Sequence, residues 1–149
     1  MSFIDTLVSH LGETGIETDD LPLLVPAVIA AGALVAFADG AADGRELREI
    51  DAEALRCLMG DEERAADIHR VLDQHLSNFD RDRTFGHDRA LAVLADFAPD
   101  APVGQRQLVL RSALQVGGAG AGRTPSPGER DAAREIARIL RLDPDAQGL

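Results

Sequence analysis

The stretch LPLLVPAVIAAGALVAFA, from Leu21 to Ala38, carries no charged side chain and lies between two aspartates. Its length alone would allow a helix to cross a membrane. Pro22 and Pro26 interrupt its first turns, however, and Ala and Gly dilute its hydrophobicity. Acidic residues also flank both ends, where Arg, Lys, Trp or Tyr anchor a membrane span. The stretch therefore predicts the buried central helix of a helical domain.

The composition of the whole chain agrees with a helical fold. The 149 residues are 45% hydrophobic, and Ala and Leu dominate while Trp and Tyr are absent. Such a balance favours helix over sheet, and a chain of this length can bury roughly two-thirds of its surface. We expect an all-α fold: a single compact bundle of about seven helices over residues 21–149, with a partial internal repeat. Residues 1–20 are expected to form a weak helix and a mobile acidic linker.

The charge balance limits the classes of partner. The chain has 26 Asp and Glu against 15 basic residues, all of them Arg, and a formal net charge of -11. Binding to nucleic acid or to an anionic membrane needs a surplus of positive charge, so neither is expected, and no membrane insertion is expected either. The first basic residue is Arg45, so the N-terminus lacks the positive lead-in of a secretory signal or transit peptide.

Helix-capping signals divide the rest of the chain into further helices. Each signal is a capping residue, or a Pro or Gly, placed just before a run of apolar residues at helical spacing. The predicted helices begin near Asp43, Asp61, Gly86, Pro102 and Ser126, and the polar stretch from Asn78 to Thr84 is predicted to be a loop. The segments that open at Asp43 and Ser126 resemble each other, and an offset of 83 residues places Glu46 on Glu129.

One acidic cluster carries the candidate chemistry. Asp39, Gly40, Asp43 and Glu46 have the separations of positions five, six, nine and twelve of an EF-hand loop. Positions one and three would be apolar, so this is half of a calcium loop, and the other oxygens would come from water or from a distant part of the chain. The same residues are also explained as the end of one helix and the cap of the next, without any ligand.

The string AAGALVAFADG, followed by Glu46, resembles the signature of the tellurite-resistance TerB family. The similarity extends to the strings FDRDRTFGHDRALAVL and REIARILRLDP. It implies a cytoplasmic, all-helical protein of tellurite and stress resistance that binds a divalent cation, calcium or magnesium, through acidic clusters. It also implies a protein partner, a TerC-type membrane protein met at its cytoplasmic face. By this resemblance, Asp39 and Glu46 correspond to the acidic signature of the family.

The second half of the chain departs from that family pattern. Where a second Ala-Asp-Gly is expected before the last helix, the sequence has Gly122 and Arg123, and only Glu129 is retained. Because a positive Arg123 weakens cation binding, we expect one degenerate site at most, with Asp39, Asp43, Glu46 and Glu129 as its candidate ligands.

Three weaker candidates remain. Arg130, Arg134, Arg138 and Arg141 form a basic stripe that either docks an acidic partner or is the outer face of a terminal helix. His69 and Asp73 are four residues apart, as in a solvated helix pair, and Cys57 is expected to be a buried small residue. The order of residues shows no catalytic centre, so we expect no enzyme activity. The alternative to cation binding is a metal-free interaction module that docks through its acidic N-terminal half and the Arg stripe.

Overall fold

A computed structural model describes residues 18–38, 59–116 and 126–149 of the chain. Over these residues it contains helices and no strand, which confirms the all-α class. The α-helices are α2 (Leu21–Ala36), α5 (Glu62–Arg81), α6 (Arg83–Phe97), α7 (Val103–Val116) and α8 (Pro127–Ile139), and the 3-10 helices are η1 (Thr18–Asp20), η2 (Ala98–Asp100) and η4 (Asp145–Gln147). The predicted total of seven helices includes segments outside these ranges.

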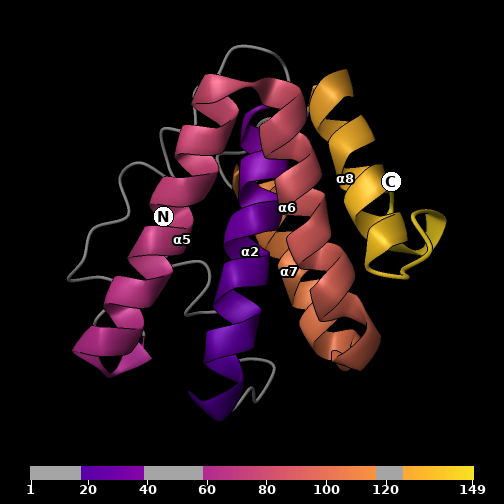
Figure 1. The fold of residues 1–149 in the computed structure, drawn as a ribbon. Helices are drawn as coiled ribbons and strands as arrows, with labels where there is room; N and C mark the ends of the chain where they lie inside the picture. The colour runs from indigo at the N-terminus through magenta and orange to yellow at the C-terminus, as the bar shows by residue number, and fades with distance from the viewer. Residues whose placement is uncertain (1–17, 39–58, 117–125) are drawn as a thin grey trace.

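Helix α2 is the centre of the described core. It contacts each of α5, α6, α7 and α8, and Figure 1 shows it running between the α5–α6 pair and α7. Nearly all of its side chains are buried, including Leu24, Ile29 and Val35, so the apolar stretch is a core helix as predicted. No helix in the described ranges is long and apolar enough to cross a membrane.

Helices α5 and α6 form a hairpin joined by Asp82 alone, so the predicted loop from Asn78 to Thr84 is wrong. Asp82 is extended, which ends α5, and its carboxylate accepts hydrogen bonds from the N–H groups of Thr84 and Phe85. One aspartate therefore closes one helix and caps the next. The polar stretch looked like a loop because most of its side chains are exposed, although Asn78 and Phe79 are buried on α5.

A glycine allows the two helices of this hairpin to meet. A Cβ atom at Gly86 of α6 would lie 2.7 to 2.8 Å from atoms of Phe79, backbone atoms included. No larger residue fits without moving α6 away from α5. The ring of Phe79 also stacks on Phe37, at the end of α2, with ring centroids 4.6 Å apart. The α5–α6 turn is thus packed directly on the end of the central helix.

Two other predicted caps are confirmed. The Asp61 carboxylate accepts from the N–H groups of Glu63 and Arg64 at the start of α5. At the start of α8, the Ser126 hydroxyl accepts from the N–H of Glu129 at 3.1 Å. Gly60, which precedes the first of these caps, has φ of +71°, a left-handed conformation that favours glycine.

Candidate functional site

A cavity of about 470 Å³ lies where α2 ends and α8 begins. Leu34, Phe37 and Ala38 line it from α2 and the residues just after that helix, while Arg83 and His87 line it from the first turns of α6. Helix α8 contributes its first residues to the other side. We name this cavity, bounded by Ala38, Arg83, His87, Gly128, Asp131 and Glu135, the junction pocket.

Arg83 fixes the end of α2 at this pocket. Its Nη2 donates to the carbonyl oxygen of Phe37 at 2.8 Å and, at 3.5 Å, to that of Ala38. These carbonyls belong to the negative end of the α2 dipole, where a cation is stabilising. The guanidinium therefore occupies the position that a metal ion bound to the same two carbonyls would take. Any cation bound at this end of the helix would depend on side-chain oxygens.

His87 joins α6 to α8 across the junction pocket. Its Nε2 lies 2.6 Å from an oxygen of Glu135, and its Nδ1 lies 3.2 Å from the carboxylate of Asp88. Burial by itself lowers the pKa of His87, but the hydrogen bonds and charges of Glu135 and Asp88 outweigh it and raise the pKa above the ordinary 6.5. Both carboxylates favour the imidazolium, so His87 in its protonated form is a cationic bridge between two helices.

The predicted cation ligands are only partly within the described ranges. Asp39, Asp43 and Glu46 lie outside them, as does Cys57. Glu129 lies in the first turn of α8 and is half-buried. In the described part of the chain, no three His, Cys, Asp or Glu side chains gather in a group that could hold a metal ion.

Two residues that lie next to predicted ligands in sequence line the junction pocket. They are Ala38, the residue before Asp39, and Gly128, the residue before Glu129. These two positions are ninety residues apart in sequence and belong to different helices or their ends.

The weaker candidates have definite places. Three arginines of the predicted stripe are exposed: Arg130 and Arg138 on α8, and Arg141 beyond the end of that helix. The fourth, Arg134, is half-buried, and its Nη1 lies 3.6 Å from Oδ1 of Asp131. The His69 ring lies 3.2 Å from the carboxylate of Asp73 on the surface of α5, as expected for a solvated pair. Exposed arginines agree with both interpretations of the stripe, a docking face for an acidic partner and the outer face of a terminal helix.

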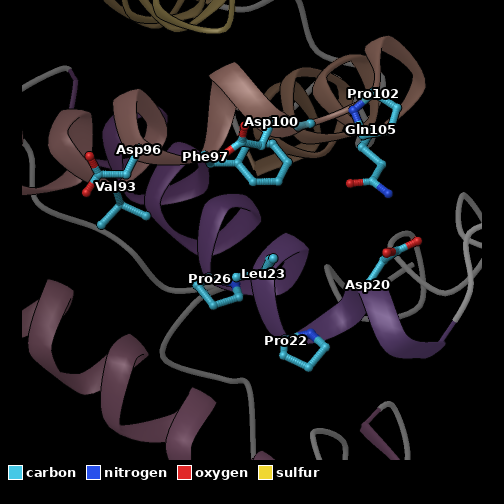
Figure 2. Close-up of a pocket in the computed structure, with 11 residues that line it drawn as sticks. Asp20, Pro22, Leu23, Pro26, Val93, Asp96, Phe97, Asp100, Pro102 and Gln105 are labelled. Atoms are coloured by element: carbon cyan, nitrogen blue, oxygen red, sulfur yellow. The ribbon is translucent and has the colours of Figure 1, made fainter.

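Sequence reasoning missed a second cavity, of about 560 Å³, at the opposite end of the bundle. It lies where α2 begins, α6 ends and α7 begins, and we name it the acidic groove. Figure 2 shows Pro22, Leu23 and Pro26 of α2 between the carboxylates of Asp96 and Asp20. No spacing in the sequence signals this groove, because helices that are distant along the chain build it.

No family model matches the chain, and it has no match among curated proteins or solved structures.

Proposed function

We propose that this chain is a non-enzymatic, cytoplasmic TerB-like protein of tellurite or stress resistance that binds calcium or magnesium at the junction after α2. Asp39, Asp43, Glu46 and Glu129 are its proposed ligands, and a TerC-type membrane protein is its proposed partner. The single observation that carries the proposal is that Ala38 and Gly128 line one pocket. The residues that follow them in sequence are Asp39, which belongs to the family signature, and Glu129, which the partial repeat pairs with Glu46.

The chemistry of the ligands supports a hard divalent cation. Calcium and magnesium bind carboxylate oxygens, and several carboxylates close together repel each other unless a cation screens them. The end of α2 is already held by Arg83, whose guanidinium takes the helix carbonyls. The positive charge of Arg83 would lower the affinity of the site for a cation nearby. The loss of the second Ala-Asp-Gly motif should lower this affinity too, because it removes a carboxylate. We therefore expect weak binding, of the kind that responds to a change in cation concentration.

A bound cation would change the stability of the folded chain by thermodynamic linkage. A cation that binds only the folded chain stabilises it by about 2.7 kcal/mol when its concentration is a hundred times the dissociation constant. For a chain of this size, that corresponds to a rise of roughly 5 to 10 °C in the melting midpoint. The proposed consequence is an ordered junction that the protein partner recognises.

Thermal melting tests the proposal. The unfolding of the full chain is followed by circular dichroism in calcium, in magnesium and in excess chelator. We expect a higher midpoint with at least one cation, and we expect the gain to disappear in the double variant Asp39→Asn with Glu46→Gln. The matched control, Glu63→Gln with Asp67→Asn, removes two exposed carboxylates from α5 and should keep the gain. A midpoint that is the same with cation and with chelator would exclude a stabilising cation.

A further inference from the structure

The acidic groove has an apolar floor that is open to solvent. Leu23 is 75% exposed although it belongs to the central helix, and Val103, next to the groove residue Pro102, is 53% exposed. Only one other large apolar side chain in the described ranges, that of Phe85, is comparably exposed. Of these three side chains, Leu23 lines the groove, and Val103 follows the lining residue Pro102 in sequence. Exposed apolar surface of this kind, enclosed by polar groups, is typical of a binding site.

Three carboxylates border that floor. They are Asp20 before α2, Asp96 in the last turn of α6 and Asp100 in η2. No Arg or His within the described residues forms an ion pair with any of them. The groove therefore presents three carboxylates, without an ion pair to any described residue, around an apolar surface (Figure 2).

One of these aspartates is unfavourable for its own helix. Asp96 lies at the C-terminal end of α6, where the helix dipole makes a negative charge unfavourable. Asp20, by contrast, occupies the N-cap position of α2, where the dipole favours its charge although its side chain makes no capping hydrogen bond. Local helix stability thus does not explain Asp96. A residue that is unfavourable for its own helix in this way is expected at a binding site.

From these observations we infer that the acidic groove binds a short segment of a partner protein in which one large apolar side chain lies between basic residues. The apolar side chain would fill the space beside Leu23, and the basic side chains would pair with Asp96, Asp100 and Asp20. Arg is suited to this role because its planar guanidinium donates two parallel hydrogen bonds to a carboxylate. This inference concerns the end of the bundle opposite the junction pocket and does not require a cation.

Charge distinguishes this partner from the chain's own N-terminal segment. Residues 1–17 contain apolar side chains, but their charged side chains are the acids Asp5, Glu13 and Glu17. Such a segment would bring negative charge to three carboxylates, whereas a basic segment would neutralise them. Anionic lipid is disfavoured for the same reason.

The test is a titration of the full chain into fluorescein-labelled peptides, measured by anisotropy in excess chelator. The probe is the pentapeptide Arg-Arg-Leu-Arg-Arg. Its controls are the same peptide with Ser for Leu, a charge-reversed Glu-Glu-Leu-Glu-Glu peptide, and a peptide of residues 1–17. We expect the probe to bind at least tenfold more tightly than any control, with an affinity that falls as salt is added.

Variants of the full chain locate the binding. Asp96→Asn with Asp100→Asn should weaken probe binding at least tenfold, and Leu23→Ala should weaken it severalfold. All three positions are exposed, so the fold should be preserved. The matched controls are Glu63→Gln with Asp67→Asn, which removes the same charge from α5, and Phe85→Ala, which truncates an exposed side chain near the other end of α6. Both controls should bind the probe as the parent chain does.

Several results would overturn the inference. The first is that the Arg-Arg-Leu-Arg-Arg probe does not bind, and the second is that both charge variants, Asp96→Asn with Asp100→Asn and Glu63→Gln with Asp67→Asn, lose probe affinity equally. The third is that the 1–17 peptide or the Glu-Glu-Leu-Glu-Glu peptide binds more tightly than the probe. The fourth is that the chain self-associates and that Leu23→Ala abolishes this self-association. The outcome is independent of the cation proposal, because the titration contains chelator and the melting experiment contains no peptide.

Discussion

The Nε2 atom of His87 lies 2.6 Å from an oxygen of Glu135 and links α6 to α8 across the junction pocket. The two residues are 48 positions apart, so the pair connects the middle of α8 to the first turns of α6. Because Asp88 contacts the other ring nitrogen, the imidazolium has a carboxylate on each side. This arrangement makes the stability of the junction depend on pH.

His87→Gln should lower stability most at acidic pH. The folded state holds the His87 proton more tightly than the unfolded state, so its contribution is fully present below the ordinary pKa of 6.5 and is lost as pH rises through the raised folded value. Denaturant unfolding of the parent and the variant at pH 5.5 and pH 8.5 measures this. The difference between the two proteins should be larger at pH 5.5. A difference that grows toward pH 8.5 would contradict the cationic bridge.

His75 should have the opposite effect. It is buried on α5, its Nδ1 has no hydrogen-bond partner among the residues that the structure describes, and burial lowers its pKa below 6.5. The unfolded state therefore binds a proton that the folded state resists, and stability is lost as pH falls through 6.5. His75→Leu should raise the free energy of unfolding at pH 5.5 by more than at pH 8.5. Denaturant unfolding of the parent and the variant at the two pH values measures this, and an equal change at both would contradict the prediction.

Gly86→Ala should destabilise the chain by about 1 to 3 kcal/mol, the usual cost of overpacking. The new methyl group would meet the backbone of Phe79, which cannot rotate away as a side chain can. Gly104→Ala is the matched control, since a Cβ there has nothing within 4 Å and alanine favours a helix. Urea unfolding compares the two variants. Equal effects at the two glycines would show that the α5–α6 contact is less close than described.

Arg83→Met should destabilise the chain by about 1 to 2 kcal/mol, because it removes the hydrogen bonds to the last carbonyls of α2. Arg81→Met, at an exposed position two residues earlier on α5, should have an effect close to zero. If the cation proposal is correct, Arg83→Met should also bind calcium or magnesium more tightly, because a neighbouring positive charge has been removed. Urea unfolding and a cation titration measure these two effects separately.

The sequence predicts the elements whose signals are local. An uncharged run of helix-forming residues identified α2, and Asp61 and Ser126 marked the starts of α5 and α8 through caps that lie within a few residues of their partners. The α5–α6 boundary was misjudged because one residue, Asp82, performs two capping roles that usually require a longer loop.

The sites depend on contacts that local signals do not report. Nothing in the spacing of His87 and Glu135 indicates that they touch, and Arg83 meets Phe37 from 46 residues away. In the sequence, Asp20, Asp96 and Asp100 look like ordinary solvated acids. Only the packing of α2 against α6 and α7 places all three around one apolar groove.

Titration calorimetry of calcium and magnesium into the chelator-treated full chain measures cation binding at the junction itself. We expect saturable binding with about one site per chain, which is lost in the variant Asp39→Asn with Glu46→Gln, weakened in Glu129→Gln, and retained in Glu63→Gln with Asp67→Asn. Heats no larger than dilution for both cations, or equal binding by the Asp39→Asn, Glu46→Gln variant and the parent chain, would contradict it.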